Sequence, residues 1–307
     1  PATLFGFWLY GWPSLWLWLA TVLAALAGEA VGLRLMARPA MPVLRNGSAL
    51  LTGWLLALSL PPSAPVWIGI LGGLFATLVA KQLFGGLGQN LFNPAMVARV
   101  FLLVSFPLPM TAWIAPLDAV SSASLLGHAK TELSRGVDLL HSLAAMPAHD
   151  WDAWLGLRAG SLGETSILLI AAGGAVLLVR RVITWHIPLA MLAGALLPAA
   201  IAHAADPARH LDAWTHLVSG GLVLGAFFIA TDYVTSPNTP AGQLVFGLGC
   251  GLLTWVIRTW GGYPEGVAFA VLLMNAAAPM IDRSIRPRIY GRDRKGEPLP
   301  LPAREES

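Results

Sequence analysis

Long apolar runs separated by short polar stretches dominate this chain, and they predict helices that cross a membrane. A helix needs roughly 20 apolar residues to span a bilayer, and several runs approach that length. We expect nine such helices, at residues 13–36, 47–60, 64–83, 91–106, 162–180, 187–204, 217–235, 241–260 and 264–282. Some are short and end at proline, as at Pro61-Pro62 and Pro237. Broken helices of this kind are stable in a membrane where neighbouring protein or a cavity satisfies their free backbone groups.

Composition places the chain in the same class. Of its 307 residues, 56% are hydrophobic and 11% are charged, and the mean hydropathy is +0.67. This is more apolar surface than a soluble core of this size hides, so we expect a multi-span membrane protein. The chain begins at Pro1 inside an apolar stretch, and we expect a further helix to precede it.

Charge and cysteine content exclude several classes of function. The net charge of +3 does not indicate nucleic-acid binding, because most Lys and Arg lie at the ends of apolar runs and not in one patch. The single cysteine, Cys250, excludes a disulfide framework and any iron–sulfur cluster built by this chain alone. We predict no metal site and no catalytic cluster in the chain itself.

The basic residues predict the orientation, because loops on the cytoplasmic side carry an excess of Lys and Arg. If the Arg-rich tail after Asp282 is cytoplasmic, the alternation of helices also places Arg180-Arg181 and Arg34, Arg38 and Arg45 on that side. The same alternation places residues 107–161, where acidic residues outnumber basic ones, on the outside. The independent clusters agree, so we expect a cytoplasmic C-terminus and a periplasmic loop at 107–161.

An internal repeat is visible at an offset of 175 residues. The shared positions pair Pro62, Pro65, Gly72 and Gly86 with Pro237, Pro240, Gly247 and Gly261. Five helices separate equivalent elements, so the second copy is expected upside down relative to the first, as in transporter-like folds with a site near the midplane. The predicted fold is therefore all-α, with about nine or ten transmembrane helices in two inverted repeats. Its parts are a first repeat at 1–106, a loop at 107–161, a second repeat at 162–291 and a tail at 292–307.

Four longer motifs carry a resemblance to a known family. They are Lys81-Gln-Leu-Phe-Gly-Gly-Leu-Gly-Gln-Asn-Leu-Phe-Asn-Pro-Ala-Met96, Gly160-Ser-Leu-Gly-Glu-Thr-Ser166, Phe227-Phe-Ile-Ala-Thr-Asp232 and Gly261-Gly-Tyr-Pro-Glu-Gly-Val-Ala-Phe-Ala-Val-Leu-Leu-Met-Asn275. Together they resemble the RnfD/NqrB family, membrane subunits of the Rnf and Na⁺-translocating NADH:quinone reductase complexes. The likeness runs from about Phe5 to Gly291. The short chain and the stretch at 185–188 look more like the RnfD branch.

The resemblance implies a covalent FMN in the 107–161 loop. Members carry FMN esterified through its phosphate to Thr, in a pattern close to Asp-Gly-x-Ser/Thr-x-Ala-Thr. Here that pattern falls on Asp118-Ala-Val-Ser121-Ser-Ala-Ser124, so Ser124 stands at the acceptor position. A serine hydroxyl forms the same phosphoester, and Asp118 is expected to serve recognition or metal positioning by the attaching transferase. The predicted orientation, reached without the family, places Ser124 on the outer side, where that enzyme is expected to act.

Residues where the loop re-enters the membrane are also candidates to contact this flavin. Gly160 and Ser161, with Glu164 and Thr165, offer small residues and hydroxyls that suit packing around an isoalloxazine ring. A competing interpretation makes Ser161 the cap of a helix with Glu164 at its third position. Both interpretations can hold.

A second, non-covalent flavin, riboflavin in NqrB, is also implied by the resemblance, deeper between the repeats. The matching positions are Asn90, Asn93 and Asp232. Amides can bond the pyrimidine edge of a flavin, and Asn93 precedes Pro94 at an expected helix start with free backbone NH groups. Amide bonds between helices are the alternative for the two asparagines, and structural pairing is the alternative for Asp232.

The function implied is a flavin-carrying subunit of an ion-translocating ferredoxin:NAD oxidoreductase of the Rnf type, in the bacterial inner membrane. Such a complex is a redox-driven translocase (EC 7 type), and this chain is not expected to act alone. Partners implied are an FMN-bearing extracytoplasmic subunit and Fe–S subunits, through which ferredoxin and NAD react. The alternatives are an NqrB-like component of a quinone reductase, a flavin-free channel or transporter of the same architecture, and an assembly component without flavin.

Overall fold

The computed structural model describes residues 1–114, 121–122, 124–139, 154–157, 159–287 and 297. Within these ranges the chain is almost entirely helical, and the one sheet described is a two-stranded antiparallel pair of β1 (Trp113–Ile114) and β2 (Ser121–Ser122). Five helices in the described part are long and apolar enough to cross a membrane, at Ala2–Leu35, Val66–Phe84, His186–Ala205, Pro240–Trp260 and Val267–Ser284. The protein is therefore an all-α, multi-pass membrane protein, as the sequence predicts.

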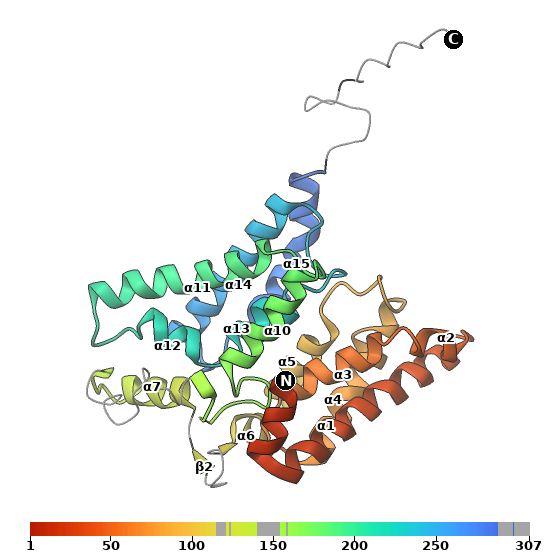
Figure 1. Ribbon diagram of the computed structural model, residues 1–307, viewed down its shortest axis with the longest axis horizontal. Coiled ribbons are helices and arrows are strands. Elements are labelled where there is room, and N and C mark those ends of the chain that lie inside the picture. Colours follow the sequence, from red (N-terminus) through yellow and green to blue (C-terminus); the bar gives the residue numbers. More distant parts are fainter. Residues whose placement is uncertain (115–120, 123, 140–153, 158, 288–296, 298–307) are drawn as a thin grey trace.

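The first half runs from α1 to α6 (Figure 1). Its elements are α1 (Ala2–Leu35), α2 (Ala40–Leu44), α3 (Ser48–Ser59), α4 (Val66–Leu74), the π-helix η1 (Phe75–Val79), the 3₁₀-helix η2 (Gln82–Phe84), α5 (Pro94–Ser105) and α6 (Pro107–Thr111). A kink at Gly11, where φ is 69°, divides α1 just before Pro13. That break explains why the sequence predicts a helix from residue 13.

The second half runs from α10 to α15. It contains α10 (Ile167–Val179), α11 (His186–Ala205), α12 (Ala213–Val218), α13 (Leu222–Leu224), the π-helix η3 (Gly225–Ile229), α14 (Pro240–Trp260) and α15 (Val267–Ser284). Between the halves lies α7 (Leu125–Ser134). Figure 1 shows α7 near α12, at the end of the molecule opposite the end of α15.

Two further predicted helices differ from those observed. The helix predicted at 162–180 begins at Ile167, because Ser166 and not Ser161 caps it, accepting a hydrogen bond from the Leu169 N–H at 3.4 Å. The helix predicted at 217–235 is broken and ends at Ile229. Gly220, at φ 67°, interrupts its start, a conformation that glycine adopts without steric cost.

Glycines bring the paired helices of each half close together. In the first half α4 packs along α1, and a Cβ on Gly73 would lie 2.5 Å from the Thr21 carbonyl oxygen. In the second half α14 packs along α11, and a Cβ on Gly247 would lie 2.7 Å from the Ile187 carbonyl oxygen. Small residues at helix contacts let backbones approach closely in membrane proteins. At the repeat's offset of 175 residues, however, Gly247 corresponds to Gly72, where a Cβ would meet side chains of Leu102 and Leu56 and not α1.

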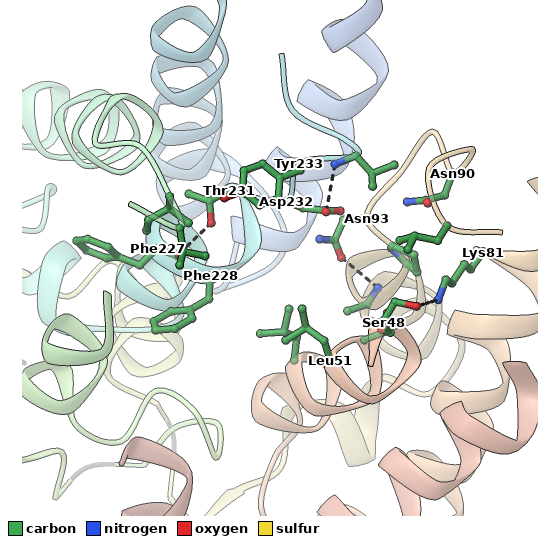
Figure 2. A pocket seen from close by; sticks show the side chains of 18 of the residues that line it. Ser48, Leu51, Lys81, Asn90, Asn93, Phe227, Phe228, Thr231, Asp232 and Tyr233 are labelled. Atoms are coloured by element: carbon green, nitrogen blue, oxygen red, sulfur yellow. Dashed lines mark hydrogen bonds between the residues drawn. The ribbon is translucent and has the colours of Figure 1, made fainter. Parts of the chain in front are cut away.

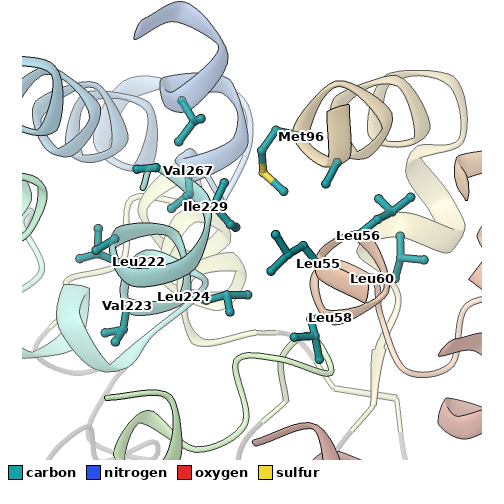
Figure 3. Packing of buried hydrophobic residues seen from close by; sticks show 14 of the residues in the cluster. Leu55, Leu56, Leu58, Leu60, Met96, Leu222, Val223, Leu224, Ile229 and Val267 are labelled. Atoms are coloured by element: carbon teal, nitrogen blue, oxygen red, sulfur yellow. The ribbon is translucent and has the colours of Figure 1, made fainter. Parts of the chain in front are cut away.

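Leucine-rich faces of α3 and of α13 with η3 meet between the halves. Figure 3 shows the side chains of Leu55 and Leu58 on α3 facing those of Leu224 and Ile229, with Met96 of α5 beside them. All are buried in one cluster. A polar contact crosses the same interface, where Asn275 Oδ1 accepts the backbone N–H of Asn93 at 3.0 Å.

Candidate functional site

Ser124, the predicted FMN acceptor, is the N-cap residue of α7. Its Oγ accepts a hydrogen bond from the Gly127 N–H at 3.2 Å, and its backbone is extended. The helix that follows has ten residues, of which Leu125, Leu126 and Ala129 are buried. The hydroxyl therefore sits at the positive end of a helix dipole, beside backbone N–H groups that the helix itself leaves free.

The other residues predicted to contact this flavin lie in different parts of the structure. Asp118 lies outside the described residues, and Ser121 lies in β2, paired in register with Ile114. Gly160, Ser161, Glu164 and Thr165 precede α10 and are packed between the two halves.

This segment is held by main-chain bonds to the end of α3. The Leu162 N–H donates to the Leu60 carbonyl at 3.2 Å, and the Gly163 N–H donates to the Leu58 carbonyl at 2.7 Å. Glu164 Oε2 accepts the Ser161 N–H at 3.3 Å. The side chain thus makes the reciprocal half of a capping box, although the helix predicted with it does not start there.

A second carboxylate, Glu265, approaches the same place from the α14–α15 loop and was not singled out from the sequence. Its Oε2 accepts the Gly221 N–H at 3.0 Å, and its Oε1 lies 3.0 Å from Arg258 Nη2. Arg258 also donates to the carbonyls of His216 at 2.8 Å and Ser219 at 2.9 Å. Arg258 is therefore a buried structural cation and not a snorkelling one. The only sequence signal for this cluster was an acid in a Gly- and Pro-rich loop.

A cavity of about 380 Å³ lies between the halves, beside η3 and the turn that follows it. Figure 2 shows Ser48, Leu51 and Lys81 of the first half on one wall, with Phe227, Phe228 and Asp232 of the second half opposite. All three residues predicted for the second flavin, Asn90, Asn93 and Asp232, line it. Its size and mostly apolar lining, with a few polar groups, are typical of small-molecule sites.

These three polar residues are not equally available to a ligand. Asn93 caps α5, its Oδ1 accepting the N–H groups of Ala95 and Met96 at 3.1 and 3.2 Å, so the predicted helix start is confirmed. Asp232 follows η3 in a turn, not within a helix, and accepts from Val234 N–H at 3.3 Å and Thr235 Oγ1 at 3.1 Å. Asn90 Oδ1 is buried with no hydrogen-bond partner among the described residues.

An ion pair beside the cavity was also missed from the sequence. Lys81 Nζ lies 2.9 Å from Glu29 Oε1 and donates to Ser48 Oγ at 2.7 Å, with the Lys81 and Glu29 side chains 2% and 0% exposed. Lys81 is therefore paired inside the protein and does not reach the membrane surface. The available signal was an isolated acid in the long apolar run of α1.

Comparison with known proteins agrees with this architecture. The profile of the NQR2, RnfD, RnfE family matches residues 1–291. A component of the ion-translocating oxidoreductase complex of Halorhodospira halophila is 50% identical, covering 97% of this chain and 90% of that protein. The protein of the same name from Stutzerimonas stutzeri is 51% identical, covering 97% of this chain and 91% of that protein. That from Rhodobacter capsulatus is 48% identical over 84% of this chain and 78% of that protein. The chain belongs to the NQR2, RnfD, RnfE family.

Proposed function

We propose that this protein is the flavin-carrying membrane subunit of an ion-translocating oxidoreductase complex of the Rnf type. In this proposal one FMN is esterified to Ser124 on the outer face, and a second, non-covalent flavin occupies the cavity between the repeats. Electron flow is coupled to transport of Na⁺ or H⁺. The relatives named as components of ion-translocating oxidoreductase complexes support this assignment.

The observation that carries the proposal is the cavity. A site for the isoalloxazine needs flat apolar walls and a few hydrogen-bonding groups that fix one edge of the ring. Phe227 and Phe228 supply aromatic surface, and Asn90 Oδ1 is a buried acceptor without a partner among the described residues. An unsatisfied buried acceptor costs about 1–3 kcal/mol, so a ring N–H donor at this position would remove that cost. Asp232, which belongs to the second half, supplies a further polar group to the cavity wall.

The surroundings of Ser124 suit a phosphoester. A phosphate on Oγ would stand at the N-terminus of α7, where backbone N–H groups and the helix dipole favour negative charge. The Gly127 N–H that now bonds the hydroxyl would then have a phosphate oxygen as its acceptor. The flavin supplies the redox chemistry at each site, and the protein sets its burial, orientation and hydrogen bonding.

The two proposed flavin sites lie toward opposite ends of α14, which fits a different role for each. The cavity is lined by residues up to Val234, in the turn that leads to the start of α14 at Pro240, and α7 is bonded to the other end of this helix. The 21 residues of α14 extend about 30 Å. One site therefore serves the outer face and the other the cytoplasmic side. Ferredoxin and NAD react through partner subunits of the complex, among them an FMN-bearing outer subunit and Fe–S subunits. Asp232 and the cavity are the candidates for linking electron flow to ion movement.

Flavin fluorescence on the intact complex tests the covalent site. The complex is purified, and a denaturing gel is examined for a fluorescent band at this chain. Wild type is expected to fluoresce and Ser124→Ala to be dark, because only a covalent flavin survives denaturation. A dark wild-type band contradicts covalent attachment. A fluorescent Ser124→Ala band moves it to another hydroxyl, with Ser121 and Ser122 the first candidates.

The non-covalent flavin is measured in the same preparations by acid extraction of the native complex. Asn90→Leu is expected to lower the extractable flavin while leaving the covalent band unchanged. Equal extractable flavin in Asn90→Leu and wild type contradicts the cavity as its site. A flavin-free complex with transport activity would favour a channel of the same architecture.

A further inference from the structure

Lys130 makes contacts that set it apart from every other residue of α7. Its Nζ donates to the Tyr263 carbonyl at 2.8 Å and to the Ile257 carbonyl at 3.1 Å. Within the described ranges, these are the only hydrogen bonds that α7 makes to another element. The remaining bonds of the helix are local, such as the Arg135–Glu132 pair on its surface. Burial of the ammonium lowers the pKa of Lys130, a cost that the bonds to the two carbonyls offset.

The two acceptors lie where α14 ends and the loop to α15 begins. Ile257 lies in the last turn of α14, where the helix dipole favours a cation, and its carbonyl also accepts the Gly261 N–H at 2.9 Å. Tyr263 lies in the loop to α15. Arg258, the next residue of that turn, is paired with Glu265, and Glu265 in turn accepts the Gly221 N–H. These bonds connect the end of α14 to the start of α13. Gly221 begins the short α13 and η3 helices, and these lead to Asp232 of the cavity.

The last turn of α14 is therefore bonded on two sides. Through Arg258 and Glu265 it is bonded to the start of α13, which continues into η3 at the cavity wall. Its outer side is bonded, through Lys130, to the helix that begins at Ser124. Lys130 lies six positions after Ser124, a rise of about 9 Å along an α-helix. A bond at Lys130 therefore restrains the position of the Ser124 hydroxyl.

We propose that Lys130 is a positioning residue that latches α7 to the end of α14 and so fixes the covalent flavin relative to the membrane domain. This inference rests on the proposed flavin at Ser124. Without Lys130, α7 would keep the contacts of its buried apolar residues but lose its hydrogen bonds to the end of α14 and the loop to α15. A cofactor attached at its N-cap, Ser124, would then change position. A displacement of about 1 Å can cost roughly a hundredfold in a reaction rate.

The test compares Lys130→Met with Lys130→Arg in the intact complex. Methionine keeps an unbranched side chain without charge or donors, whereas arginine can restore donation to the two carbonyls. Arg135→Met is the matched control, since it removes the cation at the C-cap of α7. The Arg135 side chain is 67% exposed and pairs with Glu132 of the same helix. Amide hydrogen exchange over residues 125–134, flavin fluorescence on the denatured band, and the rate of flavin reduction are measured for each.

We expect Lys130→Met to raise amide exchange in α7 at least about tenfold, the effect of losing two hydrogen bonds to a charged donor. Its covalent flavin should be retained and its rate of flavin reduction should fall by about tenfold or more. Lys130→Arg should bring the amide exchange of α7 and the rate of flavin reduction most of the way back to wild type. Arg135→Met should match wild type in both measurements. Unchanged exchange in Lys130→Met overturns the latch, and unchanged reduction with intact flavin overturns the positioning role.

Exchange is also measured in the Ser124→Ala background, where no flavin is attached. There Lys130→Met should still loosen α7, so the latch is judged independently of the cofactor. A dark wild-type band would contradict the proposed function and with it the positioning of a flavin. The exchange data would then test only whether Lys130 holds α7 against the end of α14.

Discussion

The buried pair of Glu29 and Lys81 allows a quantitative test of how charge is held in this fold. The two side chains are at most 2% exposed, and their charged atoms lie 2.9 Å apart. At an effective dielectric constant of about 20, the attraction at this distance is about 6 kcal/mol before desolvation is counted. Removing one partner of such a pair costs about 3–5 kcal/mol, because it leaves an uncompensated buried charge.

Lys81→Met is the perturbation that isolates this effect. The side chain keeps most of its length, while Glu29 loses its cation and Ser48 Oγ loses a donor. We expect a clear fall in the apparent unfolding temperature and in the yield of the purified complex. The measurement is thermal unfolding followed by intrinsic tryptophan fluorescence at a fixed scan rate, since unfolding of such complexes is often irreversible.

The double variant decides between charge and packing as the cause. Glu29→Leu with Lys81→Met removes both charges and should recover most of the stability lost in Lys81→Met, because no unpaired ion remains. Arg135→Met is the exposed control and should cost less than about 1 kcal/mol. If the double variant is as unstable as Lys81→Met, the lost stability comes from packing and the electrostatic reasoning is refuted.

Two further substitutions test the packing between and within the halves, each read out as the apparent unfolding temperature of the complex. Gly251→Val places a side chain against the Met191 carbonyl in the contact between α11 and α14 and should cost about 1–3 kcal/mol or more; a neutral result would contradict close packing there. Asn275→Ala leaves the buried Asn93 N–H without its acceptor and should cost about 1–3 kcal/mol, whereas an unchanged unfolding temperature would show that this contact between the halves is not made.

The features of this fold that could be predicted from the sequence are those set by local patterns of residues. The apolar runs predicted the helices of both repeats, and Asn93-Pro94 predicted the start of α5, because a cap followed by proline acts within one turn. Prediction from the sequence failed at Ser161, where a capping pattern forms one turn that does not continue. The chain there is held by bonds to the end of α3, about a hundred residues away, and no local signal reports such a contact.

The candidate sites divide in the same way. The motifs placed Asn90, Asn93 and Asp232 on the wall of one cavity, while their availability differs for reasons that only the fold supplies. Asn93 is committed to its helix and to the opposite half, and Asn90 retains a free acceptor among the described residues. Glu265, Glu29 and the contacts of Lys130 were not foreseen.

Hydropathy and helix breakers determined by themselves that this is an all-α membrane protein, because burial in lipid and backbone satisfaction act on every residue. Which charges meet was decided by the tertiary structure alone. The Glu29–Lys81 pair, the Arg258–Glu265 cluster and the bonds of Lys130 to the end of α14 each join segments that the sequence keeps apart. Their energy arises only when the fold brings the partners together and excludes water between them.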